Sequence, residues 1–284
     1  MKSPLPDSLL TPPLLNALAE DIGQGGDLTS LSTIDPHKDG IATLNARENG
    51  IVAGISAARL TFSLVDPACN VTCHVQDGDP IEPGTTLLTA TGPAQGLLTA
   101  ERTALNILSH LSGVATLTSA YVGKVHGTKA RIAGTRKTLP GLRVLQKHAI
   151  RAGGGMTHRM SLSDAVMIKD NHIVAAGSIE AAITNARAFA GHTVKIEVEV
   201  DTLAQLDEAL RAKPDIVLLD NMSTDDLSEA VRRASGQTIL EASGGVTLDS
   251  VQAIAATGVD IISVGALTHS ARSIDIGMEL SARS

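Results

Sequence analysis

A strand–helix alternation from Arg131 to the end of the chain constrains the fold more than any other feature of the sequence. Six short apolar segments are predicted strands, and the last four recur at intervals of roughly 20 to 25 residues. They are ARIAGT (130–135), AVMIKD (165–170), TVKIEVEV (193–200), DIVLLD (215–220), TILEAS (238–243) and DIISVGA (260–266). Helical patterns lie between them, notably over 178–191, 202–213, 224–234 and 247–258. Such repetition predicts a parallel sheet that closes, or nearly closes, into an α/β barrel.

The first 110 or so residues have a different pattern. A short helix is predicted over 14–22, and the segments around 40–54 and 70–92 alternate polar and apolar residues, as antiparallel strands do. A long helix is predicted from Leu97 to about Val125, with Thr99 as its cap. We therefore expect a smaller mixed α/β domain over residues 1–112 and the barrel over 113–284, with the last 14 or so residues packing back on the first domain.

Composition excludes several classes of protein. The 284 residues carry a formal net charge of −7 and contain no Trp, one Tyr and two Phe, which argues against a nucleic-acid-binding surface. No apolar run reaches the roughly 18 residues of a membrane helix, and the first residues lack a signal-peptide core. Cys69 and Cys73 have a spacing unsuited to a zinc knuckle. We expect two free thiols and a cytoplasmic protein.

Positive charge is concentrated in one stretch of this acidic chain. Residues 131–169 hold eight Lys and Arg but one acidic residue, whereas the rest of the chain holds 15 basic and 29 acidic residues. Arg143, Lys147 and Arg151 are spaced by four, which predicts a helix surface. Other members lie at predicted strand or loop ends and are candidates for binding a small anion: Arg136, Lys137, His158, Arg159 and Lys169.

Acidic residues mark the ends of two neighbouring strands. In KIEVEV, Glu197 and Glu199 share one face, although a barrel strand is normally apolar on both faces. Salt bridges to Lys or Arg would account for Glu197, whereas Glu199 lies nearer the carboxyl end, where barrels hold their active sites. Asp220 ends the next strand, where it serves either as a turn cap or as a ligand. Glu199 and Asp220 are therefore candidate Mg²⁺ ligands.

Two glycine-containing loops follow the last two strands. ASGGV (242–246) leads into a helix predicted from Thr247, and SVGA (263–266) leads into a short final helix. In α/β barrels these last loops commonly bind phosphate through backbone N–H groups and helix N-termini. The sequence therefore predicts a phosphate site at this end of the barrel.

Several long motifs, in order, resemble the quinolinate phosphoribosyltransferases, also called nicotinate-nucleotide pyrophosphorylases (carboxylating). The motifs are AEDIGQGGDLTS, ERTALNILSHLSGVAT, TRKTLPGLR, GGGMTHRMSLSDAVMIKDNHI, EVEVD, LEASGGV and ISVGALTHS. The resemblance covers nearly the whole chain. It implies an incomplete α/β barrel with a mixed α/β N-terminal domain, in homodimers or dimer-based assemblies where that domain covers a partner's site.

The resemblance also implies a reaction: quinolinate and 5-phosphoribosyl 1-pyrophosphate, with Mg²⁺, give nicotinate mononucleotide, CO₂ and pyrophosphate in NAD biosynthesis. Arg102 would reach the partner's site, and Lys137, Glu199 and Asp220 would be catalytic. Substrate-binding positions carried over from the family are Arg102, Thr135, Arg136, Lys137, His158, Arg159, Lys169, Glu199, Asp220, Ser243, Gly244, Gly245, Val264, Gly265 and Ala266. Gly134 and His148 depart from the family pattern, where an Asp and an aromatic residue are expected.

Two other functions compete with this one. A Schiff-base lyase would use Lys137 or Lys169 as the amine nucleophile, and borohydride with substrate would trap its adduct. A related protein encoded with molybdate-transport genes shares the overall pattern but should differ around IKDNH (168–172), which this chain retains.

Overall fold

The computed structural model describes residues 4–282. The chain divides into two compact units, each described here by itself. One unit holds the chain up to residue 119 together with residues 138–154 and the residues from 267 onward. The other, which we call the barrel unit, holds residues 120–137 and 155–266. Short stretches of the middle and end of the chain thus belong with the N-terminal residues.

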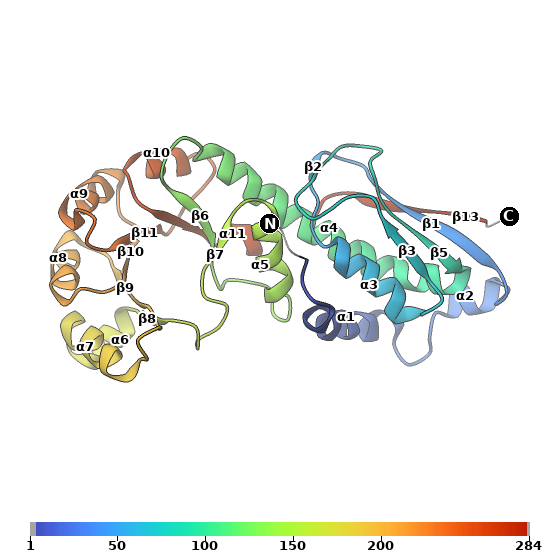
Figure 1. Cartoon of the computed structure of the whole chain (residues 1–284), viewed down its shortest axis with the longest axis horizontal. Coiled ribbons are helices and arrows are strands. Elements are labelled where there is room, and N and C mark those ends of the chain that lie inside the picture. Colours follow the sequence, from blue (N-terminus) through green and yellow to red (C-terminus); the bar gives the residue numbers. More distant parts are fainter. Residues whose placement is uncertain (1–3, 283–284) are drawn as a thin grey trace. The chain divides into compact units, whose positions relative to one another are not determined.

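The barrel unit is built on a seven-stranded parallel sheet in the order β7-β6-β12-β11-β10-β9-β8. Its strands are β6 (Arg131–Gly134), β7 (Met156–Thr157), β8 (Val166–Ile168), β9 (Ile196–Val200), β10 (Ile216–Asp220), β11 (Ile239–Ser243) and β12 (Ile261–Val264). The strands form an open arc with helices on its outer side (Figure 1). Because β7 and β8 are the two edges and do not pair, the barrel is incomplete, which confirms the predicted fold class.

Helices connect β8 to β9, β9 to β10, β10 to β11 and β11 to β12. In that order they are α6 (Asp170–Ala176) with α7 (Ile179–Phe189), α8 (Leu203–Ala212), α9 (Thr224–Ala234) and α10 (Val251–Ala256). Helix α11 (Ala266–His269) follows β12, and its residues from Leu267 onward belong to the other unit. Ser178, Thr202 and Ser223 cap α7, α8 and α9 by accepting a backbone N–H in the first turn. Buried aliphatic side chains such as Leu206 and Leu227 face the sheet.

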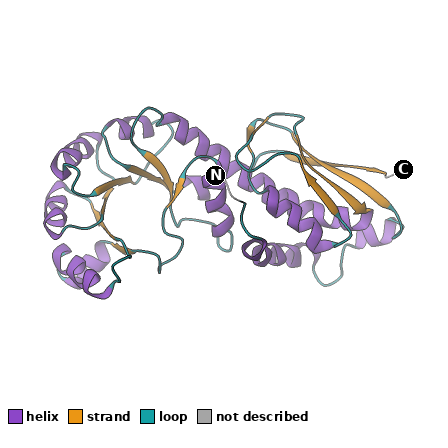
Figure 2. Cartoon of the chain, viewed as in Figure 1, coloured by secondary structure: helices purple, strands orange, loops and turns teal. Residues whose placement is uncertain are grey.

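The other unit contains an antiparallel sheet in the order β13-β1-β5-β3 and a second pair, β2-β4. These strands are β1 (Asp39–Ala46), β2 (Gly50–Ile51), β3 (Asn70–Cys73), β4 (Pro80–Ile81), β5 (Thr86–Pro93) and β13 (Ile276–Ala282). Its helices are α1 (Asp7–Ile22), α2 (Leu28–Thr33), α3 (Ile55–Val65), α5 (Arg143–Ala152) and most of α4 (Ala94–Lys124). Figure 2 separates its strands from its helices by colour.

The core of this unit is aliphatic, as the shortage of aromatic residues requires. Leu44 and Leu88 are fully buried, Ile276 of β13 joins the same cluster, and Phe62 is its one aromatic member. Strand β13 pairs with β1 over seven positions, from Ala46↔Ile276 to Gly40↔Ala282, so the chain's last strand completes this sheet. Apolar burial of this kind stabilises the fold by about 25 cal/mol per Å².

Several local predictions are wrong. Helix α1 begins at Asp7 rather than Leu14, and Thr99 lies inside α4, where its hydroxyl donates to the Gln95 carbonyl instead of capping. Lys147 was expected on a helix surface, but its side chain is buried. Helix α10 begins at Val251, after a turn that starts at Thr247. Local pattern does not reveal these features, because packing around each segment decides them.

No helix in the described part of the chain is both long and apolar enough to cross a membrane. Cys69 is buried and Cys73 exposed, and both are free thiols. Burial, with a smaller contribution from nearby Asp66, raises the pKa of Cys69 to about 11.

Candidate active site

A cavity of about 390 Å³ lies at the carboxyl ends of the barrel strands. It is lined by Thr135, Arg136, Lys137, His158, Arg159, Met167, Lys169, Glu199, Leu218, Asp220, Glu241, Ser243 and Ser263. All of these residues belong to the barrel unit. The structure therefore brings together nine residues predicted from the sequence, although they come from segments as far apart as residues 135 and 243.

The parallel register explains why the strand residues share one cavity. Glu199 of β9 lies opposite Leu218 of β10, which lies opposite Glu241 of β11. Side chains two residues apart point to the same face of a strand, so Asp220 and Ser243 continue the inward face one level higher. The carboxyl ends of parallel strands meet at one edge of the sheet, which makes this end the natural place for a site.

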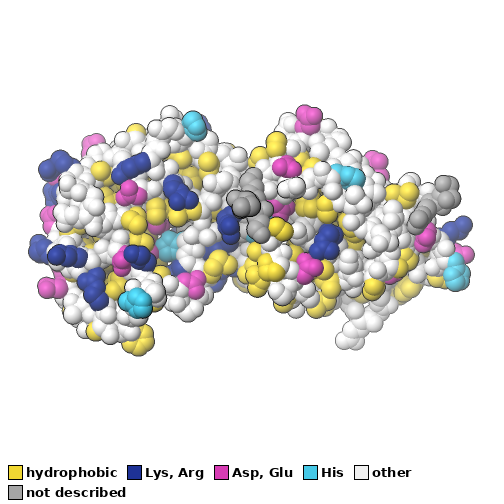
Figure 3. All heavy atoms as spheres, viewed as in Figure 1, with side chains coloured by type: hydrophobic (Ala, Val, Ile, Leu, Met, Phe, Trp, Pro, Cys, Tyr) yellow, Lys and Arg dark blue, Asp and Glu magenta, His cyan; other side chains and the backbone are white. Residues whose placement is uncertain are grey.

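Basic side chains from the loops form one wall of the cavity. Arg136 and Lys137 follow β6, Arg159 follows β7 and Lys169 follows β8. The Arg159 guanidinium donates to the Ala165 carbonyl at 3.1 Å, which fixes its position. Burial, and next the positive charge of Arg136, lower the pKa of Arg159, but an arginine remains cationic. On the face drawn in Figure 3, Lys and Arg side chains gather over the barrel unit.

The two acidic strand ends face this basic wall. Glu199 accepts a hydrogen bond from the ammonium group of Lys169, and Asp220 accepts one from the Asn221 side-chain amide at 2.7 Å. Neighbouring strands carry the two carboxylates, as predicted. Carboxylate oxygens are hard ligands that suit Mg²⁺, which is usually held by one or two carboxylates and keeps several waters or phosphate oxygens of its own. The residues present therefore fit this cation.

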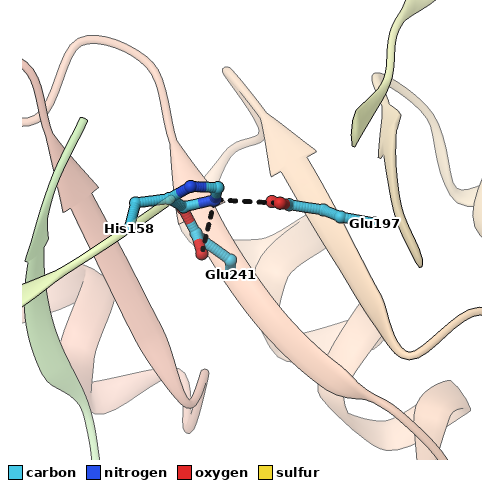
Figure 4. A group of neighbouring side chains, drawn as sticks. All are labelled: His158, Glu197 and Glu241. Carbon is cyan, nitrogen blue, oxygen red and sulfur yellow. Dashed lines mark hydrogen bonds and ion pairs between the residues drawn. The ribbon is translucent and has the colours of Figure 1, made fainter. Parts of the chain in front are cut away.

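His158 lines the cavity, and its ring points toward two buried carboxyl groups, Glu197 and Glu241 (Figure 4). Its Nε2 is 2.9 Å from Oε2 of Glu197 and 3.9 Å from Oε2 of Glu241. These glutamates are only 1% and 2% exposed. The backbone N–H of Arg159 donates to Nδ1 of His158 at 2.8 Å, so the ring proton is on Nε2 and points to Glu197. Glu197 is paired with a histidine, not with the expected Lys or Arg.

The loop after β11 needs glycine at its first position. Gly244 has a φ of +89°, and a Cβ atom there would lie 2.2 Å from Oδ1 of Asn221 and 2.9 Å from its backbone nitrogen. Gly245, with a φ of +58°, has nothing within 4 Å of the corresponding point. The loop after β11, at Gly244, and the loop after β10, at Asn221, therefore lie in close contact beside the cavity.

This difference gives a matched pair of variants. Gly244→Ala is expected to lower the free energy of unfolding by about 2–4 kcal/mol, since it combines left-handed strain with a collision. Gly245→Ala, with the strain alone, should cost about 1–2 kcal/mol. Urea unfolding of both variants measures the difference, and equal losses would contradict the collision.

The remaining predicted residues do not line this cavity. Arg102 lies in α4 of the other unit, with its side chain 63% exposed and 4.0 Å from Glu101. Val264 ends β12 and is buried, and Gly265 and Ala266 follow it. Gly244 and Gly245 belong to the loop after Ser243.

Sequence reasoning missed four lining residues. Leu218, Glu241 and Ser263 lie on the inward faces of predicted strands, and Met167 belongs to the segment AVMIKD. Glu241 stands two residues before Ser243, so the same period-two argument used for Glu197 and Glu199 would have found it. The two-residue strand β7 has no comparable signal, because periodicity needs a longer segment.

The fold is that of an incomplete α/β barrel, with a cavity lined by basic and acidic side chains at the carboxyl ends of its strands, as in α/β-barrel enzymes. Two family models match the chain: "Quinolinate phosphoribosyl transferase, N-terminal domain" over residues 27–112 and "Quinolinate phosphoribosyl transferase, C-terminal domain" over residues 114–279. The chain belongs to the quinolinate phosphoribosyltransferase family.

Named relatives and solved structures agree with this assignment. The chain is 46% identical over 269 residues to the nicotinate-nucleotide pyrophosphorylase [carboxylating] of Mycobacterium leprae, covering 93% of this chain and 94% of the relative. It is 45% identical to the probable enzyme of the same name from Bacillus subtilis, covering 92% and 90%. The crystal structure of NadC from Streptococcus pyogenes matches with a TM-score of 0.95 at 38% identity, covering 99% and 100% of the two chains.

Proposed function

We propose that this protein is a quinolinate phosphoribosyltransferase (decarboxylating), a pentosyltransferase of NAD biosynthesis. It would convert quinolinate and 5-phosphoribosyl 1-pyrophosphate to nicotinate mononucleotide, CO₂ and pyrophosphate. The observation that carries the proposal is one cavity lined by four basic side chains and by the two strand-end carboxylates Glu199 and Asp220, in a chain of this family. Two polyanions and a cation-like ribosyl centre need those opposite charges close together.

Each group of residues has a separate task in this reaction. Arg136, Arg159 and Lys169 neutralise and orient the carboxylates of quinolinate, which brings the ring nitrogen to the ribose. Glu199 and Asp220 stabilise the positive charge that develops at the ribose carbon as pyrophosphate leaves. Lys137 binds the departing pyrophosphate.

The loops after β11 and β12 bind the phosphate group. Ser243, Gly244 and Gly245 provide one set of contacts, and Val264, Gly265 and Ala266 the other. Thr135 and His158 complete the floor and wall of the quinolinate pocket. Mg²⁺, held by Glu199 and Asp220, would supply positive charge that neutralises the pyrophosphate leaving group.

We further propose a homodimer, or an assembly of such dimers, in which Arg102 completes the partner's site. The Arg102 side chain supports this, because it is 63% exposed and lies 4.0 Å from Glu101, the outer limit of an ion pair. We also propose a cytoplasmic location, which the two free thiols support.

The proposal is tested by incubating the purified protein with both substrates and Mg²⁺. Nicotinate mononucleotide, CO₂ and pyrophosphate should appear in equal amounts. Chromatography measures the mononucleotide, and an enzymatic assay measures pyrophosphate. Turnover that requires no phosphoribosyl pyrophosphate, or a borohydride-trapped adduct on Lys137 or Lys169, would instead support the Schiff-base lyase.

Metal dependence provides a second prediction. Glu199→Ala and Asp220→Ala should each reduce kcat/KM for phosphoribosyl pyrophosphate by about 100-fold and raise the Mg²⁺ concentration at half-maximal rate. Quinolinate binding, measured by calorimetry without the second substrate, should change much less. Asp225→Ala, an exposed carboxylate in the first turn of α9, is the control. Full activity of both variants at limiting Mg²⁺ would contradict the roles of Glu199 and Asp220.

A further inference from the structure

Glu241 is a buried carboxyl group at the boundary between two cavities. It lines the 390 Å³ cavity of the proposed site, and with His158 it also lines a second cavity of about 220 Å³. Ile216 and Ile261, at the starts of their strands, line the second cavity, which therefore lies toward the amino ends of the barrel. Its rim includes Lys195, whose side chain is 66% exposed. The second cavity thus extends from Glu241 to a lysine at the protein surface.

The surroundings of Glu241 favour its neutral form. Glu197 lies beside it, and Oε1 of each glutamate is buried without a hydrogen-bond partner among the described residues. Two ionised carboxylates at this depth would leave charge uncompensated, which is costly. The only ring proton of His158 is directed to Glu197. Burial, and next the charge of Glu197, raise the pKa of Glu241 to about 7, while His158 and the Ser263 hydroxyl oppose the increase.

A divalent metal is the alternative occupant of this cluster, because one nitrogen and two carboxylate oxygens lie within 4.8 Å of one another. The hydrogen bonding of His158 argues against it. Since Nδ1 accepts the Arg159 N–H, Nε2 carries the proton and has no lone pair to give to a metal. The cluster therefore resembles a site that stores a proton rather than one that holds a cation.

The proposed reaction needs a proton at one defined step. When the carboxyl group at C2 of the pyridinium ring departs as CO₂, its bonding electron pair stays on C2, next to the positively charged nitrogen. A proton must form the new C2–H bond before CO₂ adds back to this carbanion, so a missing proton donor lowers the net release of CO₂. We propose that Glu241 is a further catalytic residue that donates this proton from its neutral carboxyl group. Glu241 is left as a carboxylate and recovers a proton from solvent through the second cavity.

This inference rests on the proposed function, but the two can fail separately. The measurement is the ratio of CO₂ to pyrophosphate in a single turnover, with quinolinate radiolabelled in its 2-carboxyl group. Wild-type protein that releases neither product would overturn the proposed function itself. With wild type active, Glu241→Gln should lower the ratio by about 100-fold, and the carboxylated mononucleotide should accumulate. An unchanged ratio overturns the inference alone.

Glutamine preserves the size of the side chain and an oxygen that can accept from Ser263, so the variant should fold. Its free energy of unfolding gives an independent check. A carboxyl group with a raised pKa stabilises the fold below its unfolded pKa, and this contribution is lost as the pH rises through about 7. Glu241→Gln should lack that loss, which urea unfolding at pH 6 and pH 8 would detect. Loss of both products from a folded Glu241→Gln protein would indicate a binding role and overturn the inference.

A pH profile of the wild-type protein requires no variant. The CO₂-to-pyrophosphate ratio should fall as the pH rises through about 7, because a general acid is lost above its pKa. Glu197→Gln removes the neighbouring negative charge and should move this limb to lower pH. The titratable and charged groups that face Glu241 or share its cavities, together with its hydrogen-bond partner Ser263, are Glu197, His158, Arg136, Lys137, Arg159, Lys169, Glu199, Asp220, Asp164 and Lys195.

Two results would overturn the inference. One is a fall in the ratio that occurs at the same pH in Glu197→Gln as in wild type. The other is wild-type protein that contains one metal ion per chain, with the ion absent from Glu241→Gln.

Discussion

Mixing two inactive proteins, Arg102→Ala and Lys137→Ala, is expected to restore about one quarter of wild-type activity. Lys137 lines the barrel cavity, whereas Arg102 lies in the other unit with an exposed side chain. If each site takes Arg102 from the partner, a mixed dimer has one intact site and one site with both substitutions. Random exchange makes about half of the dimers mixed, which gives one quarter of the sites.

Each variant alone should have about 1% of wild-type kcat/KM, the larger of the losses expected when a contact to a desolvated anion worth about 1.5–3 kcal/mol is removed. Mixing Arg136→Ala with Lys137→Ala is the control, because both residues line the same cavity and no mixed dimer has an intact site. Subunit exchange is verified by mass spectrometry of differently tagged chains. Absence of recovery after complete exchange would place Arg102 in its own subunit's site or outside any site.

Arg159→Ala is expected to reduce kcat/KM for quinolinate by about 1,000-fold and to weaken the preference for quinolinate over nicotinate. Quinolinate has two carboxylates and nicotinate one, so nicotinate leaves a cation of the basic wall without its partner. Each charged contact is worth about 1.5–3 kcal/mol, which corresponds to roughly 10- to 100-fold. A guanidinium that makes two such contacts therefore accounts for the expected loss.

Kinetics with both acids measure the preference directly. Lys169→Ala should change it in the same direction, although loss of the bond to Glu199 adds an effect on the ribose side. Lys124→Ala removes an exposed lysine at the end of α4 and should leave both rates unchanged. Equal use of the two acids by wild-type protein, or full selectivity in Arg159→Ala, would show that charge counting does not set specificity.

The sequence predicts those parts of the site that come from long, regular segments. The apolar runs located strands β9, β10 and β11. Their order along the chain was enough to predict that Glu199 and Asp220 lie on neighbouring strands. The loop glycines and the basic residues followed from composition at strand ends. Local pattern was enough here because each βα unit repeats the same geometry.

Features that depend on packing were not predictable in this way. The charge of Lys147 suggested solvent, but α5 presents it to the interior. His158 was assigned to substrate alone, whereas its two ring nitrogens contact the Arg159 backbone and Glu197. A pairing across 39 residues, such as His158 with Glu197, leaves no periodic signal in either segment.

The unclosed barrel has a consequence for how this protein avoids aggregation through the edges of its sheet. Exposed sheet edges are templates on which a second chain can add a strand and begin a fibril. Here β7 and β8 are the edges of the seven-stranded sheet, and they have two and three residues. Edges this short have too few backbone N–H and C=O groups to hydrogen-bond stably with a strand of another chain. Loop shortening that extends either strand would therefore favour precipitation before it changed any chemistry.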